Sequence, residues 1–203
     1  MKTILFDLGA NNGSRWYDTL VSDQENIHVY MFEPTPQLCK IIEEKYKTLK
    51  NWTLIQKAVS NFDGKTTFNV AGHYDWGCSS LYNFRNDVNI TWPNDRKDFH
   101  FTEKIEVEVI SLNSFLLNNP QIQYIDYLHV DTQGSDLNVL KGCSKYLNYI
   151  KRGNIEAALE APLYDKSPTK DECIEWLTNN GFIIDSVTGG PHECDIFFYN
   201  KSL

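Results

Sequence analysis

Apolar residues along the chain fall into short continuous runs that alternate with segments of helical spacing. Residues 3–8 and 28–32 are short runs, ended by Gly9 and Glu33, and they predict two buried strands. Residues 37–49 carry apolar side chains three and four positions apart, which predicts a helix. The same patterns predict strands at 52–59, 66–71, 104–110, 124–130, 154–159, 182–187 and 195–199, and helices at 14–22, 112–117, 136–146 and 169–180. This alternation predicts an α/β fold with a doubly wound, mostly parallel sheet and an antiparallel C-terminal hairpin strand.

Residues 72–103 interrupt this rhythm. The segment is rich in His, Tyr, Trp, Asn, Asp and Phe and has no sustained period. An irregular segment of this length inside a compact domain is usually functional. We therefore expect one domain over residues 1–203, with an inserted binding segment or lid at about 72–103. A loop that folds over the core and buries its own aromatic side chains is the alternative.

The composition disfavours a nucleic-acid-binding protein and an intrinsically disordered one. The 203 residues include 19 Lys and Arg against 27 Asp and Glu, a formal net charge of −8. Nucleic-acid binding needs clustered cations, so the acidic balance disfavours a nucleic-acid partner. The aromatic content of 13 % argues against intrinsic disorder. The oligomeric state stays open.

The spacing of the five cysteines and the length of the apolar runs indicate where in the cell the protein is located. The cysteines are dispersed and form no C-x-x-C pair, which favours reduced, buried thiols and predicts a cytoplasmic protein. No run approaches about 18 apolar residues, so we expect no membrane-spanning helix.

Polar residues at the ends of the first two strands indicate a binding site. The first strand ends in Asp7-Leu8-Gly9-Ala10-Asn11-Asn12-Gly13, and the glycines of this segment allow a tight turn before a helix. Glu33 ends the second strand, 20 residues after Gly13, where a carboxylate can accept both hydroxyls of a ribose. Each feature alone could be an ordinary turn or cap. Together they favour a nucleoside-containing ligand.

These segments and several others resemble the FkbM family of S-adenosylmethionine-dependent methyltransferases. The resemblance runs through DLGANNG (7–13), FEP (32–34), AVS (58–60), DG (63–64), CSSL (78–81), VISL (109–112), IDYLHVDTQG (125–134) and LKG (140–142). It implies a class I (Rossmann-like) methyltransferase fold and methylation of oxygen, often on sugars. The expected acceptor is a carbohydrate hydroxyl, for example on a deoxysugar such as rhamnose in a glycan. Methylation of a non-sugar small molecule and a non-catalytic S-adenosylmethionine-binding module are the alternatives.

The resemblance also implies which residues hold the cofactor. Asp7 and the turn that follows it would hold its amino acid end, Glu33 its ribose, and the end of the third strand its adenine. The implied cofactor-binding residues are Asp7, Gly9, Ala10, Asn11, Asn12, Gly13, Glu33, Pro34, Lys57 and Ala58.

Asp131, at the end of an apolar strand, is the first catalytic candidate. It could act as a general base on the acceptor hydroxyl, or hold Mg²⁺ or Mn²⁺ together with Glu160 at the end of the next strand. Glu156 on that strand could take the place of Glu160. Alternatively, Asp131 caps the following helix or contacts the cofactor.

The sequence departs from the family pattern around Asp131. His129 stands where a lysine is usual, and Gln133 where a glutamate is usual. His129 would share a strand face with Asp131 and could be a second base, although a core histidine is the alternative. His73 is a further candidate base. Trp76, Ser79 and Ser80 are the expected acceptor contacts.

Overall fold

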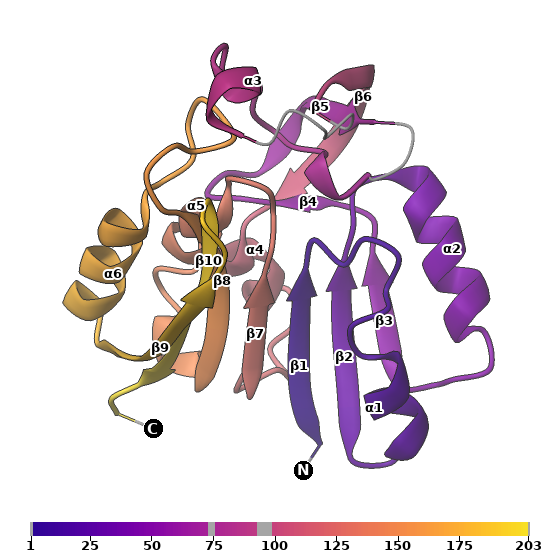
Figure 1. Ribbon diagram of the computed structural model, residues 1–203. Coiled ribbons are helices and arrows are strands. Elements are labelled where there is room, and N and C mark those ends of the chain that lie inside the picture. Colours follow the sequence, from indigo (N-terminus) through magenta and orange to yellow (C-terminus); the bar gives the residue numbers. More distant parts are fainter. Residues whose placement is uncertain (1, 73–75, 93–98, 203) are drawn as a thin grey trace.

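A seven-stranded sheet forms the body of the molecule. The computed structural model describes residues 2–72, 76–92 and 99–202, and Figure 1 shows how their helices and strands are arranged. The sheet consists of β1 (Thr3–Leu8), β2 (Ile27–Phe32), β3 (Trp52–Ile55), β7 (Tyr127–Val130), β8 (Arg152–Ala158), β9 (Phe182–Gly189) and β10 (Glu193–Asn200). Their order is β3-β2-β1-β7-β8-β10-β9, and β10 runs antiparallel to both of its neighbours. The doubly wound sheet with an antiparallel C-terminal strand is confirmed.

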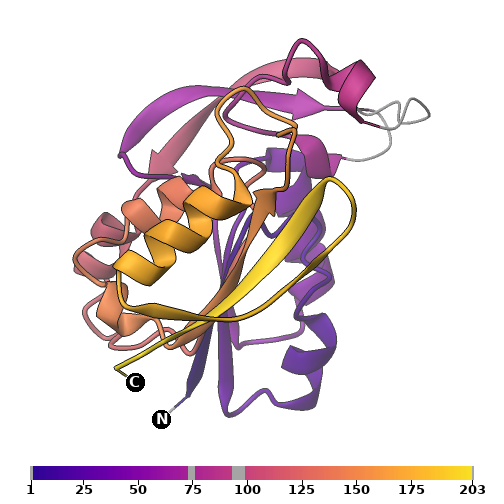
Figure 2. The ribbon, with the colours of Figure 1, turned by 60° about the vertical axis from the view of Figure 1, so that its left-hand side comes forward.

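Helices cover the sheet on two faces. The helices are α1 (Tyr17–Ser22), α2 (Pro36–Tyr46), α3 (Val88–Thr91), α4 (Leu112–Leu117), α5 (Asp136–Lys141) and α6 (Lys170–Asn179), with 3-10 turns η1 (Trp76–Cys78) and η2 (Leu147–Tyr149). Figure 2 shows α5 and α6 on one side of the sheet and α1 and α2 on the other. None of the described helices has the length and apolar character needed to cross a membrane.

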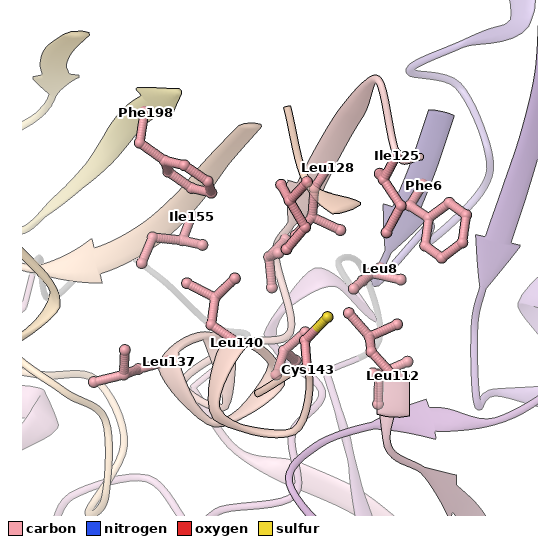
Figure 3. Close-up of a cluster of buried hydrophobic side chains, with 14 of the residues drawn as sticks. Phe6, Leu8, Leu112, Ile125, Leu128, Leu137, Leu140, Cys143, Ile155 and Phe198 are labelled. Atoms are coloured by element: carbon pink, nitrogen blue, oxygen red, sulfur yellow. The ribbon is translucent and has the colours of Figure 1, made fainter. Parts of the chain in front are cut away.

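The larger hydrophobic core lies between the sheet and the helices α4, α5 and α6. Strand residues at alternate positions face it, among them Phe6 and Leu8 of β1, Leu128 of β7 and Ile155 of β8 (Figure 3). The next positions along β1, Leu5 and Asp7, therefore face the other side. Leu5 packs there with residues of α1 and α2. All five cysteines are buried, as the sequence predicted, and none of them forms a disulfide within the described part of the chain.

A small second sheet covers the carboxyl ends of the parallel strands. It consists of β4 (Ala58–Val59), β6 (Phe101–Ile110) and β5 (Gly64–Ala71), in that order. The arrowheads of β1, β2 and β3 point toward it in Figure 1. The prediction of one strand over 52–59 is therefore wrong. The chain turns after Ile55, where Lys57 N donates to Ile55 O, and Ala58 and Val59 pair with β6 instead.

The described residues between β5 and β6 pack against the core rather than standing apart from it. Phe84 lies between Phe101 and Tyr164, with ring centroids 4.3 and 5.3 Å away and nearly parallel planes. The Trp92 side chain is buried, stacks on His192 and donates to Ala161 O. These described aromatic side chains are thus used in packing, as the alternative prediction for this segment expected.

Other element boundaries differ from the sequence prediction. The helix predicted over 136–146 ends at Lys141. A Cβ at the next residue, Gly142, would lie 2.3 Å from Ser60 O, so the backbone at Gly142 passes very close to the backbone at Ser60. The helix predicted over 14–22 begins at Tyr17, and the strand predicted over 124–130 begins at Tyr127.

Gly153 allows β7 and β8 to pair. An added Cβ at Gly153 would lie 2.2 Å from Leu128 O, a backbone atom of the neighbouring strand. We expect Gly153→Ala to lower the free energy of unfolding by about 2 kcal/mol or more, because the strands must move apart. Gly190→Ala is the matched control, since nothing lies within 4 Å of its Cβ, and it should change stability by less than about 0.5 kcal/mol. Urea denaturation of both variants tests this, and equal stabilities would contradict it.

Candidate functional site

A cleft opens where β1, β2 and β7 end beneath the small sheet. The space between its walls is about 590 Å³, a figure that includes open solvent at the mouth. The lining residues are Gly9, Asn11, Phe32, Glu33, Pro34, Thr35, Leu38, Lys57, Ala58, Val59, Phe68, Gly77, Ser79, Leu81, Asp131, Thr132 and Gln133. The cleft therefore lies at the sheet edge where ligands bind in such folds.

The turn after β1 approaches the end of β7 very closely. Gly9 has φ +85°, and a Cβ on it would lie 1.8 Å from Asp131 O. Its amide and that of Ala10 both donate to Phe32 O at 3.0 Å, which ties the turn to the end of β2. Asn11 follows with φ +51°, a conformation that asparagine tolerates better than most residues. Glycine at position 9 is thus required by both conformation and space.

Glu33 joins this turn to the start of α2. Its side chain is 4 % exposed, and one carboxylate oxygen accepts Asn11 N at 2.9 Å while the other accepts Thr35 N at 2.8 Å. Burial raises the pKa of Glu33 to about 7, although these backbone hydrogen bonds act in the opposite direction. Each carboxylate oxygen can accept a second hydrogen bond from a ligand in the cleft.

Asp7 and His129 form a buried pair behind the cleft. His129 Nδ1 lies 2.7 Å from Asp7 Oδ1, and both side chains are almost fully buried. Asp7 Oδ2 has no hydrogen-bond partner within the described structure. His129 thus faces the same side of the sheet as Asp7 and is satisfied at one nitrogen by it.

Three carboxylates surround the turn that follows β7. The side chain of Gln133 donates from Nε2 to Asp131 Oδ1 at 2.6 Å and to Glu156 Oε2 at 3.1 Å. Asp136 accepts the amides of Thr132 and Gly134, both at 3.0 Å, and so holds the turn in shape. Asp131 lines the cleft, whereas the Asp136 side chain is buried behind it.

Burial dominates the electrostatics of this group. It raises the pKa of Asp131, and the hydrogen bond from Gln133 acts against that rise. Burial also raises the pKa of Asp136 to about 8, with the nearby Asp131 as the next cause. The pKa of Glu156 is raised by burial first and by Asp131 second.

The cleft brings together eight of the residues expected at the site. Those lining it are Gly9, Asn11, Glu33, Pro34, Lys57, Ala58, Ser79 and Asp131. Asp7, Ala10, Asn12, Gly13 and His129 lie behind or beside it and are not among its lining residues. Ser79 Oγ accepts Ala71 N, and the fully buried Ser80 donates to Gln133 O, so both hydroxyls are engaged within the protein. His73 and the side chain of Trp76 lie outside the described residues.

The expected pairing of Asp131 with Glu160 does not form. Glu160 is exposed in a bend past the end of β8, because the strand ends at Ala158. The carboxylate that shares a partner with Asp131 is Glu156, the alternative named from the sequence. Among the described residues, no group of three or more His, Cys, Asp or Glu side chains is arranged to hold a metal ion.

Sequence reasoning missed Tyr164 and Thr132. Tyr164 OH lies 2.8 Å from Gln133 Oε1, across 31 residues of sequence, and no local pattern indicates that contact. Thr132 Oγ1 is buried without a partner in the described structure, and the residue lines the cleft. Thr132 could have been found, because it directly follows Asp131.

The FkbM methyltransferase domain matches residues 7–184 of the chain. The chain belongs to the FkbM methyltransferase family. No curated protein matches the sequence.

Solved structures share the fold of this FkbM chain at low sequence identity. TrmK of M. capricolum, in complex with S-adenosyl-homocysteine, is 12 % identical with a TM-score of 0.51, and the match covers 98 % of this chain and 62 % of TrmK. An O-methyltransferase family 2 protein from Planctomyces limnophilus, in complex with apigenin, is 11 % identical with a TM-score of 0.48, covering 97 % of this chain and 49 % of that one. The class I methyltransferase fold is therefore confirmed.

The cleft fits S-adenosylmethionine. The ligand has no phosphate, and the turn at 9–13 contains no lysine to hold one. The second acceptor sites on Glu33 suit ribose hydroxyls, and the unpartnered Thr132 hydroxyl lies in the lining. Apolar Leu38 and Val59 also line the cleft, whereas the Phe32 ring packs into the core against Phe6 and Phe115.

Raised carboxylate pKa values predict an unusual pH dependence of stability. A carboxyl with a raised pKa in the folded protein favours folding in full below its unfolded value of about 4, and this contribution is lost as pH rises through the folded pKa. For Glu33 and Asp136 the folded values are about 7 and about 8. We therefore expect the free energy of unfolding to fall between pH 5 and pH 8, by up to about 1.4 kcal/mol per pH unit for each such group.

Asp131→Asn should flatten this dependence. The variant removes one raised carboxyl and also a charge that raises the pKa of Glu156 and of Asp136. Asp185→Asn, on an exposed residue of β9, is the control and should leave the slope unchanged. Urea denaturation at pH 5, 6, 7 and 8 measures it. Stability that rises over this range in the wild type contradicts the prediction.

Proposed function

We propose that the protein is an S-adenosylmethionine-dependent O-methyltransferase that transfers a methyl group to a hydroxyl of a carbohydrate. The observation that carries this proposal is the cleft in which the ribose acceptor Glu33 and the carboxylate Asp131 face one space beneath the small sheet. Family membership supports methyl transfer, and a carboxylate at the end of β7 suits an acceptor that must lose a proton.

The residues that follow β1, β2 and β3 bind and orient the cofactor. When bound, S-adenosylmethionine supplies a methyl group activated on a positively charged sulfur. Glu33 would accept hydrogen bonds from the two ribose hydroxyls, and the turn around Gly9 and Asn11 would hold the amino acid end. Lys57 and Ala58 would border the adenine. Phe68 of the small sheet and Leu81, which packs in the same apolar cluster, line the cleft.

Asp131 prepares the acceptor for the reaction. A sugar hydroxyl is a poor nucleophile, and a positioned base contributes about 10²- to 10⁴-fold to such a step. Asp131 would accept the proton that the acceptor hydroxyl loses. Because burial raises the pKa of Asp131, its ionised carboxylate is a stronger proton acceptor than that of an exposed aspartate.

One assay distinguishes the carbohydrate proposal from two alternatives, a non-sugar acceptor and a non-catalytic cofactor-binding module. A labelled-cofactor assay with a panel of monosaccharide glycosides, including rhamnosides, tests the carbohydrate proposal directly. Phenolic and polyketide alcohols in the same panel test the non-sugar alternative. Binding of cofactor with no transfer to any member supports the non-catalytic module.

Glu33→Ala should abolish cofactor binding while the protein stays folded. Two hydrogen bonds from ribose hydroxyls to a carboxylate are worth roughly 1.5 to 3 kcal/mol each, so the Kd should rise by about 100-fold or more. Isothermal titration calorimetry measures the Kd, and thermal melting checks the fold. Glu43→Ala, on an exposed residue of α2, is the matched control. Unchanged affinity in Glu33→Ala removes Glu33 from the site.

Asp131→Asn should slow the chemical step with little effect on cofactor affinity. The amide keeps the shape and the acceptor for Gln133 but cannot accept a proton. Turnover should fall by at least about 10²-fold, as for a lost general base. Single-turnover kinetics and calorimetry separate the two effects. Normal turnover would move the base to His73 or His129.

A further inference from the structure

We propose that Gln133 is a positioning residue whose side-chain amide holds Asp131 and Glu156 together in the place where such a carboxylate pair would otherwise share a proton or bind a cation. The role given to Asp131 rests on the proposed function. The contacts of Gln133 and the metal-binding test below are independent of it.

The amide nitrogen of Gln133 lies between the two carboxylates. It is 2.6 Å from Asp131 Oδ1 and 3.1 Å from Glu156 Oε2. A primary amide has two hydrogens on this nitrogen, and the two carboxylates use both of them. The pair is therefore linked by a neutral group that donates in both directions.

Tyr164 sets the orientation of the amide. Its hydroxyl lies 2.8 Å from Gln133 Oε1 and 2.8 Å from Cys78 O, so its single hydrogen is shared between these two carbonyl oxygens. Tyr164 is 2 % exposed and stacks on Phe84, so its hydroxyl is held in place. With the carbonyl oxygen directed at Tyr164, the nitrogen is directed at Asp131 and Glu156.

The backbone of Gln133 is also held from outside its own turn. Gln133 has φ +54°, a backbone conformation that residues other than glycine rarely adopt. Ser80 Oγ donates to its carbonyl oxygen at 2.6 Å, and the same Ser80 oxygen accepts Tyr82 N. A residue in such an unfavourable backbone conformation is retained only when several surrounding contacts hold it there, and such residues cluster at functional sites. Both the main chain and the side chain of Gln133 are therefore fixed.

The chemistry of the pair explains why a link is needed. Two neighbouring carboxylates repel each other when both are ionised, and they then share a proton or bind a cation. Further carboxylates, Asp136, Glu193 and Asp195, add to the negative potential at Glu156. A hard divalent cation would require oxygen ligands close on every side. Here the amide nitrogen occupies the space between the two oxygens instead.

Metal titration tests the proposal without any acceptor. Gln133→Glu keeps the shape of the side chain but removes both hydrogens and adds a third carboxylate. We expect this variant to gain one Mn²⁺ site by calorimetry and electron paramagnetic resonance, and to lose it when combined with Asp131→Asn. The wild type and the uncharged Gln133→Met variant should show no Mn²⁺ binding that depends on Asp131. Gln24→Glu, on an exposed residue, controls for the added charge.

Kinetics test the positioning role. Gln133→Met should lower kcat by roughly 10- to 100-fold, the effect of losing a hydrogen bond to a charged group, with the KM for S-adenosylmethionine unchanged. EDTA should leave wild-type turnover unchanged. Added Mn²⁺ should raise the kcat of Gln133→Glu and leave that of Gln133→Met unchanged. Thermal melting confirms that the variants compared are folded.

Two results would overturn the proposal. One is an Mn²⁺ site in the wild type that Asp131→Asn removes, and the other is a Gln133→Glu variant that gains no site. If the wild type transfers no methyl group to any acceptor, the proposed function fails, while the Mn²⁺ titrations still decide the role of Gln133.

Discussion

The close approach of the Gly9 turn to the end of β7 determines the geometry of the whole site. A single Cβ at Gly9 would overlap the carbonyl oxygen of Asp131. Because the two backbones touch, the turn that faces the cofactor side and the strand that carries Asp131 cannot be placed independently. Glu33, which follows β2, connects a third strand to this contact, since its carboxylate accepts a hydrogen bond from the amide of Asn11 in the turn. Three strand ends therefore behave as one rigid unit.

The cost of this unit is the burial of negative charge. Glu33 and Asp136 are buried, Asp131 and Glu156 are half-buried, and burial raises the pKa of each of these carboxyls. Backbone amides and the Gln133 amide offset part of that cost through hydrogen bonds. A protein selected for stability alone would replace such groups with apolar ones. Their presence is typical of a site that gives up stability for function.

The sequence predicted the parts of the structure that depend on neighbours in the chain. The strand ends at Asp7, Glu33 and Asp131 could be located because apolar runs stop there and polar residues follow. Contacts between distant segments could not be located. The link from Tyr164 to Gln133, the choice of Glu156 over Glu160, and the second sheet formed by β4 with β6 all depend on tertiary packing. The split of the predicted strand 52–59 has the same origin, because Ala58 and Val59 are as apolar as a continuing strand would require.

The small sheet also has a consequence for how such proteins can diversify. The segment from β5 to β6 leaves the main fold at Gly64 and returns at Val109, two residues that pair directly with each other. A module whose two ends meet in this way can be lengthened, shortened or exchanged with little change in the entropy of closing the chain. Recombination at that junction would change the roof over the cleft while the strands that bear Glu33 and Asp131 stay as they are. Ser80 limits this freedom, because its hydroxyl lies within the exchangeable segment and donates to Gln133 O beside Asp131.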